Sequence, residues 1–465
     1  MRLDFLNREP ELRRLERVLG STEGALVCVY GRRRVGKSRL VRRALEGRRS
    51  AYFVGDDRDS PLHVAGVAEE IAGVLPGFEE VRYPDWQSLL QRFVREAPVG
   101  TCLCLDEFPA LVRASPELPS LLQKLLDGLG GSGPKFLVCG SSQRMMHGLV
   151  LDASAPLYGR AREVLRIEPL DVSWLQRAFG LASPAEAVSQ WAVWGGVPRY
   201  WELALDYASS QDAQEELLLD PQGPLHREPQ RLLLDDMSDI ARAASLLALV
   251  GGGSGRVSEL AARLGVPATS LARTLANLID LGFLARELPF GRSLRDTKRT
   301  YYRLADPLLR YYFRFVEPNR SRLAAGQTPQ VMQSIQRAWP QFLGAAWEDL
   351  ARQSVARDCI HGTTWNPASR WWGRAHDRTE IELDVVAQAS GEPSRALVGE
   401  VKLTCSAREA RGALGELEAK ARRCPDLSGR RIEPVLWVLK RRGRIDDPRV
   451  LGPDAVLRAF AESAA

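Results

Sequence analysis

Short apolar runs that alternate with helix-like patterns fill the first 165 residues of the chain. The runs ALVCVY (25–30), TCLCL (101–105) and KFLVCG (135–140) have the length and composition of buried parallel strands. From 38 to 46, apolar side chains are spaced as on one face of a helix. Strands that alternate with helices favour an α/β fold with a parallel sheet.

Residues 240–306 combine two amphipathic helical patterns with a predicted β-hairpin. The turn at 265–267 separates the helices, and Leu271, Leu275 and Leu278 share one face of the second. In a winged-helix fold this second helix lies in the DNA major groove. The alternative is a module that only packs inside the protein. The side chains expected to face DNA are Ser270, Arg273, Asn277, Arg292, Arg295, Lys298 and Arg299.

From residue 341 the pattern restarts as a helix, several strands, a helix and a strand. Glu348 lies on the first helix, and Asp384 lies near the end of an alternating strand. Glu400 and Lys402 follow on the next strand, where a spacing of two places both side chains on one face. Such a group can bind Mg²⁺ and activate water for phosphodiester hydrolysis, with the lysine steadying the nucleophile or the phosphate. The alternative is a cross-strand ion pair.

The segment GRRRVGKS lies between the first predicted strand and its helix. Its two glycines allow backbone amides and the helix N-terminus to face phosphate oxygens. Lys37 is expected to reach the β- and γ-phosphates of ATP, and Ser38 to coordinate Mg²⁺. The residues assigned to nucleotide binding in this segment are Gly31, Gly36, Lys37, Ser38 and Arg39.

Two acidic residues close the apolar strand that follows the glycine loop. Asp106 is expected to hold Mg²⁺ through water, and Glu107 to orient or activate the water that attacks ATP. An Asp–Glu pair is common on protein surfaces, but one that ends a buried strand after a phosphate-binding loop favours catalysis.

The segments FLNREPELRRLERVL, GRRRVGKS, LCLDEF, GSS, APLYGRA and GGVPRYW together resemble the archaeal-type ATPase family, a STAND- and AAA-related group of P-loop proteins. The resemblance covers about residues 1–340. It implies that Ser141 or Ser142 senses the γ-phosphate, and that Gly196 and Pro198 of the helical lid lie near the adenine. It also implies that Arg160 stabilises charge on ATP, in cis or in a neighbouring subunit. The alternatives are turn chemistry for the serines and a structural ion pair for Arg160.

The set of Asp384, Glu400 and Lys402, with Glu348 on the preceding helix, resembles the PD-(D/E)xK nuclease superfamily. This resemblance implies a restriction-endonuclease-like domain with a metal site at Asp384 and Glu400. Leu383 departs from the motif, which has proline before the aspartate. Domains of this kind can also degenerate into binding modules.

The chain has 64 Lys and Arg against 58 Asp and Glu, a net charge of +6. Residues 401–450 contain 13 basic and 7 acidic residues, so the surplus is concentrated near the C-terminus. A basic region favours DNA as a partner, although a solvated face is the alternative. No apolar run is long enough to cross a membrane, and the first residues lack a signal-peptide pattern, so a cytoplasmic location is expected.

The predicted fold is α/β, with a P-loop NTPase sheet, a helical lid, a winged helix and a restriction-endonuclease-like domain. The expected function is ATP hydrolysis that couples nucleotide state to DNA binding and Mg²⁺-dependent DNA cleavage. The alternative is a STAND-type switch that binds DNA or a protein and cleaves nothing. A homo-oligomer is left open. The expected domains are 1–165 (ATPase core), 166–239 (lid), 240–306 (winged helix), 307–340 (helical linker) and 341–465 (nuclease-like domain).

Overall fold

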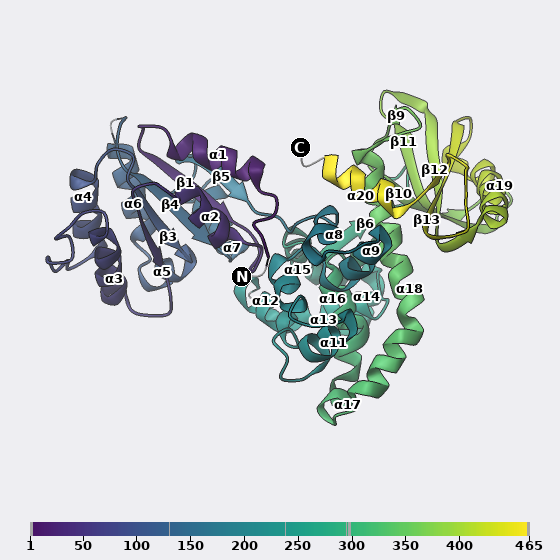
Figure 1. Cartoon of the computed structure of the whole chain (residues 1–465), viewed down its shortest axis with the longest axis horizontal. Coiled ribbons are helices and arrows are strands. Elements are labelled where there is room, and N and C mark those ends of the chain that lie inside the picture. The colour runs from purple at the N-terminus through teal and green to yellow at the C-terminus, as the bar shows by residue number, and fades with distance from the viewer. Residues whose placement is uncertain (1–2, 130, 238, 294, 296–298, 463–465) are drawn as a thin grey trace. The chain divides into compact units, whose positions relative to one another are not determined.

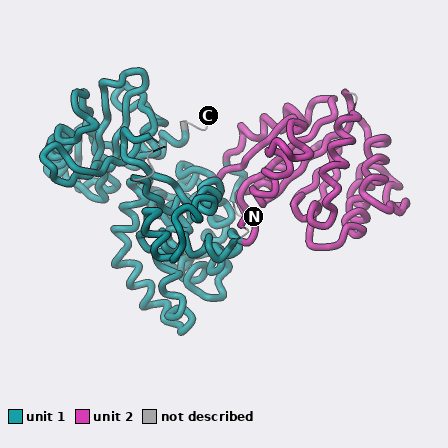
Figure 2. The backbone as a smooth tube through the Cα atoms, turned by 180° about the vertical axis from the view of Figure 1, so that it is seen from behind, with its two compact units in different colours: residues 1–6, 170–233, 239–465 teal, residues 7–169, 234–238 magenta. Residues whose placement is uncertain are grey.

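The computed structural model describes residues 3–129, 131–237, 239–293, 295 and 299–462, so the predicted wing residue Lys298 lies outside the described residues. The chain forms two compact units (Figures 1 and 2). The N-terminal unit comprises residues 7–169 and 234–238, and the C-terminal unit comprises residues 1–6, 170–233 and 239–465. The N-terminal unit therefore includes a short segment from the middle of the chain.

A five-stranded parallel sheet with the order β2-β3-β4-β1-β5 forms the centre of the N-terminal unit. Every residue of β3 and β4 is buried, which is why their sequences are mostly apolar and do not alternate with polar residues. The predicted parallel sheet is confirmed. The strands are β1 (Ala25–Tyr30), β2 (Ser50–Val54), β3 (Cys102–Asp106), β4 (Lys135–Gly140) and β5 (Ala161–Arg166).

Helices on the N-terminal unit pack their apolar faces against this sheet. Trp86, Phe93 and Phe108 are fully buried and belong to one continuous core with side chains of the sheet. The helices are α1 (Glu9–Leu19), α2 (Lys37–Leu45), α3 (Ser60–Ala72), α4 (Trp86–Glu96), α5 (Phe108–Ala114), α6 (Leu118–Gly128), α7 (Gln143–Met146) and the π-helical turn η1 (His147–Leu151).

The C-terminal unit begins with a helical region, in which Trp194, Tyr200 and Trp201 are fully buried. The last helix of this region, α12, ends at Asp236, so its final turn enters the segment that belongs to the N-terminal unit. The elements are α8 (Ser173–Phe179), α9 (Pro184–Trp194), α10 (Pro198–Ala204), α11 (Ser210–Gln214), the π-helical turn η2 (Glu215–Leu219) and α12 (Glu228–Asp236).

A helix-turn-helix and a β-hairpin follow. Gly265 ends the first of the two helices in the left-handed conformation, with a φ of +65° that favours glycine. Strands β6 and β7 pair antiparallel and form the wing. The predicted order of helix, turn, helix and hairpin is confirmed. The elements are α13 (Ile240–Gly251), α14 (Val257–Leu264), the 3₁₀ turn η3 (Ala268–Leu271), α15 (Ala272–Asp280), β6 (Leu284–Glu287) and β7 (Tyr301–Leu304).

Several short helices and the long helix α18 (Thr328–Ser354) lead from the wing to the last part of the chain (Figure 1). This helix runs unbroken through residue 340, where the sequence predicted a domain boundary. The preceding helices are α16 (Pro307–Tyr311), the π-helical turn η4 (Tyr312–Val316), the 3₁₀ turn η5 (Glu317–Asn319) and α17 (Arg320–Ala324).

The last part of the chain is built on a mixed sheet with the order β10-β11-β12-β13-β14. The pairs β10–β11 and β11–β12 are antiparallel, whereas β12–β13 and β13–β14 are parallel. Helix α19 connects β12 to β13 and packs on the sheet. The elements are η6 (Val355–Arg357), β8 (Cys359–Ile360), β9 (Thr363–Thr364), β10 (Ser369–Arg374), β11 (Glu380–Ala389), β12 (Glu392–Ser406), α19 (Ala407–Arg423), η7 (Pro425–Leu427), β13 (Arg431–Arg442), β14 (Val450–Leu451) and α20 (Pro453–Glu462).

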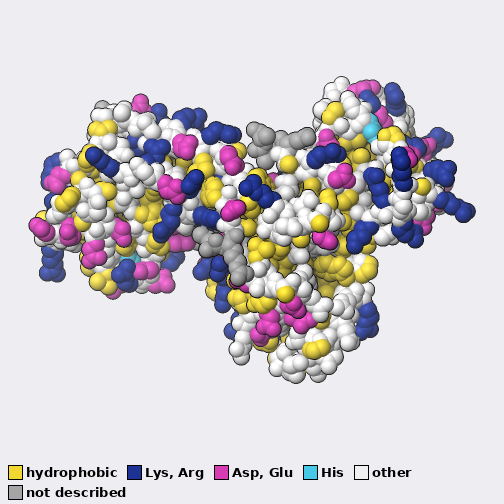
Figure 3. Space-filling model, viewed as in Figure 1, with side chains coloured by type: hydrophobic (Ala, Val, Ile, Leu, Met, Phe, Trp, Pro, Cys, Tyr) yellow, Lys and Arg dark blue, Asp and Glu magenta, His cyan; other side chains and the backbone are white. Residues whose placement is uncertain are grey.

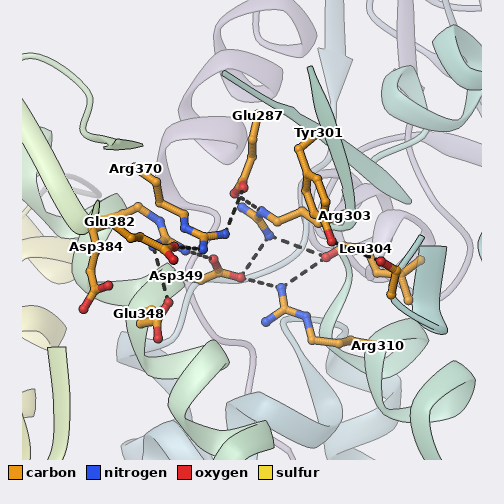
Figure 4. Close-up of polar contacts among 12 residues, drawn as sticks. Glu287, Tyr301, Arg303, Leu304, Arg310, Glu348, Asp349, Arg370, Glu382 and Asp384 are labelled. Atoms are coloured by element: carbon orange, nitrogen blue, oxygen red, sulfur yellow. Dashed lines mark hydrogen bonds and ion pairs between the residues drawn. The ribbon is translucent and has the colours of Figure 1, made fainter. Parts of the chain in front are cut away.

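A buried carboxylate joins the winged helix to α18. Asp349 on α18 accepts hydrogen bonds from Arg303 on β7 at 2.9 Å, from Arg310 on α16 and from Arg352 one turn along α18 (Figure 4). Burial alone would raise the pKa of Asp349, but these three guanidinium charges hold it well below its usual value. The wing, α16 and α18 therefore share one ionised group.

We predict that Asp349→Asn strongly destabilises the C-terminal unit. The substitution keeps the side-chain volume but leaves three arginines without their shared charge, which costs on the order of 3–5 kcal/mol when a buried pair is broken. Urea unfolding followed by circular dichroism measures the change. Asp454→Asn, which removes an exposed ion pair with Arg458, is the control and is expected to cost less than about 1 kcal/mol. Equal effects of the two substitutions would contradict the prediction.

Candidate functional site

The loop between β1 and α2 has the backbone shape of a phosphate-binding loop. Gly36 has a φ of +95° and directly precedes α2. At Gly31 a Cβ atom would lie 2.3 Å from the carbonyl oxygen of Ile167, so no larger residue fits. The loop therefore needs both glycines, one for its backbone conformation and one for close approach to the segment after β5.

Lys37 begins α2 and is 5% exposed. Its Nζ donates to the carbonyl oxygen of Arg32 at 3.0 Å, which holds the side chain across the loop. Burial lowers the pKa of Lys37, and the nearby carboxylates of Glu107 and Asp106 act against this shift. The buried ammonium group and the N-terminus of α2 give the loop the positive potential that phosphate binding requires.

Asp106 lies at the carboxyl end of β3 and is 3% exposed. It accepts hydrogen bonds from the hydroxyl groups of Tyr52 and Ser38. Burial works to raise the pKa of Asp106, but these hydrogen bonds outweigh it and hold the pKa below its usual value. An ionised carboxylate beside the Ser38 hydroxyl is a donor pair that suits Mg²⁺.

The predicted catalytic Glu107 lies one residue further, with a φ of +49° that is rare outside glycine. The Ser141 hydroxyl, at the end of β4, donates to its two carboxylate oxygens at 2.9 and 3.1 Å. The structure therefore brings together Ser38, Asp106, Glu107 and Ser141 at the carboxyl ends of parallel strands. In open α/β sheets, ligands bind at this edge.

Three residues of this site were not predicted from the sequence. Tyr52 on β2 bonds Asp106, and the segment 234–238 contributes two aspartates. Asp235 lies 3.6 Å from Arg33 of the glycine loop. Asp236 accepts hydrogen bonds from the Ser142 hydroxyl at 3.2 Å and from a backbone amide. An Asp–Asp pair at the end of a helical run looks like an ordinary surface feature, and nothing in the sequence marked it.

A cavity of about 490 Å³ lies at this edge of the N-terminal unit. Its lining includes Arg33 and Asp235 together with Glu107 and Ser141, so the added segment borders the candidate site. Burial raises the pKa of Asp236 to about 6, partly opposed by its hydrogen bonds.

The remaining residues predicted for the nucleotide site have separate positions. Arg39 lies in the first turn of α2. Arg160 makes a bidentate ion pair with Asp127 on α6, with both nitrogen–oxygen distances 2.9 Å, as in the structural alternative. Pro198 begins α10 in the C-terminal unit. The roles of Arg160 in charge stabilisation and of Pro198 at the adenine stay predictions.

The second candidate site lies where β11 and β12 separate. The ladder between these strands ends at the pair Val385 and Gly399, and the next residues are Asp384 and Glu400. Past that point an oxygen of Asp384 accepts a hydrogen bond from the backbone amide of Val401 at 2.9 Å. Burial raises the pKa of Asp384, and the nearby charge of Glu400 adds to the shift.

Two lysines and a third carboxylate border these acids. Lys402 lies 2.8 Å from one oxygen of Glu400, and Lys420 on α19 lies 3.2 Å from the other. Glu348 on α18 has a pKa raised to about 7 by burial and by the charge of Asp384. The predicted set is therefore assembled, but the described residues contain no group of three His, Cys, Asp or Glu placed to hold a metal.

Family profiles match three parts of the chain. Residues 5–203 match a family described as "ATPase domain predominantly from Archaea". These residues form an archaeal-type ATPase domain. Residues 240–288 match the IclR helix-turn-helix domain, and residues 312–413 match a family described as "Archaea bacterial proteins of unknown function". The archaeal-type ATPase domain is thus followed by a helix-turn-helix, as predicted.

Individual proteins are also similar to this chain. The uncharacterized protein MJECL04 of Methanocaldococcus jannaschii is 28% identical over 408 residues, which cover 86% of this chain and 87% of the relative. The uncharacterized ATP-binding protein MJ0423 of the same organism is 44% identical over 45 residues, which cover 10% of this chain and 76% of that protein. A solved Walker-type ATPase of Pyrococcus abyssi shares the fold of this chain with a TM-score of 0.53 and 21% identity, over 68% of this chain and 100% of its own.

The predicted nuclease-like domain stays a prediction, since the family that matches residues 312–413, and with them more than half of that domain, is described as of unknown function. None of the described helices is long and apolar enough to cross a membrane.

We predict that Asp236→Asn stabilises the N-terminal unit above pH 6. A carboxyl whose folded pKa is raised binds an extra proton in the folded state, so the free energy of unfolding falls as pH rises from about 4 to 6. The variant lacks this loss and is expected to gain up to about 3 kcal/mol at pH 7.5 and nothing at pH 4. Urea midpoints across this pH range measure the difference.

Asp57→Asn, at an exposed position beside Arg113, serves as the control and is expected to show no comparable gain at any pH. A variant at position 236 that is less stable than the wild type at pH 7.5 would show that the carboxylate is needed in its ionised form.

Proposed function

We propose that this protein is an ATPase whose nucleotide state controls DNA binding and Mg²⁺-dependent DNA cleavage by its last domain. The observation that carries the proposal is the position of Asp384 and Glu400 at the separation of β11 and β12, with Lys402 beside them. This acidic site belongs to the same compact unit as the helix-turn-helix.

In the ATP site, Lys37 and the N-terminus of α2 bind the phosphates. Ser38 and Asp106 are the residues that would hold Mg²⁺, which neutralises charge on the β- and γ-phosphates when bound. Glu107 positions the attacking water and accepts its proton. Ser141 holds the carboxylate of Glu107 in place through its hydroxyl group.

DNA is expected to meet the helix-turn-helix along α15 and the wing. Arg273 is exposed on α15, and Arg292, Arg295 and Arg299 are exposed in the segment between β6 and β7. Arginine side chains at such positions contact phosphates and fix the orientation of the duplex. Figure 3 also shows Lys and Arg side chains gathered over the part of the last domain where α19 lies.

In the last domain, Asp384 and Glu400 would hold a divalent metal, which activates water and stabilises charge on the scissile phosphate when bound. Two carboxylates on neighbouring strands, near enough for the charge of Glu400 to raise the pKa of Asp384, suit such an ion. Lys402 is within reach of the same region and contributes a positive charge for the phosphate. Glu348 is the third carboxylate of the site.

A second candidate function, a nucleotide-dependent switch that cleaves nothing, is favoured by one observation. Glu400 already has both carboxylate oxygens in ion pairs, one with Lys402 and one with Lys420. A metal would have to compete with these lysines for Glu400. In this reading the acidic site serves as a structural ion cluster, and DNA binding is the output.

Glu107→Gln is predicted to retain ATP binding but lower the rate of ATP hydrolysis at least about 100-fold, because the amide cannot accept a proton from water. Lys37→Ala is expected to lose binding itself. Binding is followed with a fluorescent ATP analogue and turnover by phosphate release. Glu117→Gln, an exposed carboxylate of the same unit, is the control. Turnover in Glu107→Gln within about threefold of wild type would rule out the role given to Glu107.

Asp384→Asn and Lys402→Ala are each predicted to lower Mg²⁺-dependent cleavage of plasmid and linear DNA at least about 100-fold, because each removes one charge from the metal and phosphate region. The assay contains ATP and either Mg²⁺ or Mn²⁺. Glu392→Gln, a carboxylate at the start of the same strand as Glu400, should cleave as wild type does.

Two outcomes of this assay separate the candidates. Cleavage that persists in Asp384→Asn comes from a contaminant or another site and removes the nuclease proposal. An absence of cleavage by the wild type, together with DNA affinity that changes between ATP and ADP, selects the switch.

A further inference from the structure

A cavity of about 610 Å³ lies between the wing strand β6, the end of α18 and the start of β10. The lining does not include Asp384 or Glu400 of the acidic site, but it includes Arg352, which contacts Asp384. Arginines dominate its lining, and two of them, Arg292 and Arg357, are exposed at its rim. The six lining arginines are Arg286, Arg292, Arg303, Arg352, Arg357 and Arg370.

The cavity has a surplus of positive charge. Among the described residues, its lining contains two acids, Glu287 and Asp349, against the six arginines. Just outside the lining, Glu382 pairs with Arg370, and Asp426 lies 3.8 Å from Arg292. Glu348 also lies beside the lining, next to Arg352, so five carboxylates within and beside the described lining face its six arginines. One positive charge remains, which a singly charged anion would balance.

Two chains of polar contacts connect residues of the cavity lining to the acidic site, and Figure 4 labels Asp349, Arg370 and Asp384 among them. In the first, Arg352 pairs with Asp349 and donates to the carbonyl oxygen of Asp384 at 3.1 Å. The same guanidinium lies 3.6 Å from Glu348. The cavity wall thus shares one arginine with two candidate catalytic residues, Asp384 through its backbone carbonyl and Glu348 through its carboxylate.

In the second chain, Arg370 on β10 lies 3.7 Å from Glu287 of the wing strand β6 and hydrogen-bonds Glu382 on β11. Glu382 precedes Asp384 by two residues on the same strand, so both point to one side of it. Both strands of the wing are therefore connected to the acidic site, β6 through Arg370 and β7 through Arg303 and Asp349.

We propose that this cavity binds phosphates of a DNA strand on its way to the acidic site. The planar guanidinium group suits bidentate contact with a phosphodiester. A DNA strand, rather than a free nucleotide, fits the position of the cavity between the wing of a helix-turn-helix and the Asp384 site. The inference rests on the proposed function, because it assigns a path for the same substrate.

The test uses the full chain with Asp384→Asn, in EDTA, so that binding is measured without cleavage. Arg292→Gln and Arg357→Gln, singly and together, are titrated with a fluorescent oligonucleotide, single-stranded or duplex, at several salt concentrations. Each substitution is expected to weaken binding about fivefold and to reduce the slope of log K against log salt by about one. Arg374→Gln, an exposed arginine at the end of β10 outside the cavity, is the matched control.

Inorganic phosphate and a deoxynucleoside monophosphate are the competing probes. If Arg357→Gln abolishes saturable binding of these probes but leaves DNA affinity and its salt slope unchanged, the cavity takes a free phosphate and the DNA assignment is overturned. Unchanged affinity for every probe overturns the site altogether.

The outcome is independent of the nuclease proposal. If the wild-type chain fails to cleave DNA while Arg292→Gln and Arg357→Gln weaken DNA binding, the cavity proposal stands and the nuclease proposal is rejected. If the wild-type chain cleaves DNA and neither substitution changes DNA affinity, the nuclease proposal stands and the cavity proposal is rejected.

Discussion

The arrangement of the C-terminal unit depends on one buried carboxylate, Asp349. An ionised group inside a protein is strongly unfavourable unless it is paired and hydrogen-bonded. Here the pairing comes from three arginines on separate elements, β7, α16 and α18 itself. The carboxylate is stable only when the wing, the helices after it and α18 come together, and in that arrangement Arg352 reaches the backbone of Asp384. The ion pairs of Asp349 therefore stabilise the packing of these elements and also hold Arg352 beside the candidate site.

In the N-terminal unit, several acidic side chains lie close together in the region that is expected to bind phosphates. Asp106, Glu107, Asp235 and Asp236 all lie at the carboxyl edge of the sheet or in the segment next to it. Their charge is offset by Lys37, by Arg33 and by hydroxyl donors such as Tyr52. Burial raises the pKa of Asp236 to about 6, and the nearby charge of Asp235 adds to this shift. Binding of a nucleotide with its metal would redistribute these charges.

The sequence predicted the parts of both sites that lie at strand ends. Glycine positions, the acids after a buried strand and the spacing of Glu400 and Lys402 all follow from local periodicity. It could not reveal Asp236, because that contact joins segments far apart in the chain. Nor could it separate Glu348 from Asp349, adjacent acids of one helix of which only Asp349 is deeply buried. Burial of a charge is decided by partners such as Arg303, which lie on other elements.

The most direct test of the account is the rate at which the wild-type chain cleaves DNA with Mg²⁺ in the presence of ATP, ADP or no nucleotide. If nucleotide state controls the acidic site, the rate should differ at least about tenfold between ATP and the other two conditions, equivalent to about 1.4 kcal/mol of coupling. The same rate in all three conditions would contradict control by the ATPase domain. No cleavage in any of them would contradict the role given to Asp384 and Glu400.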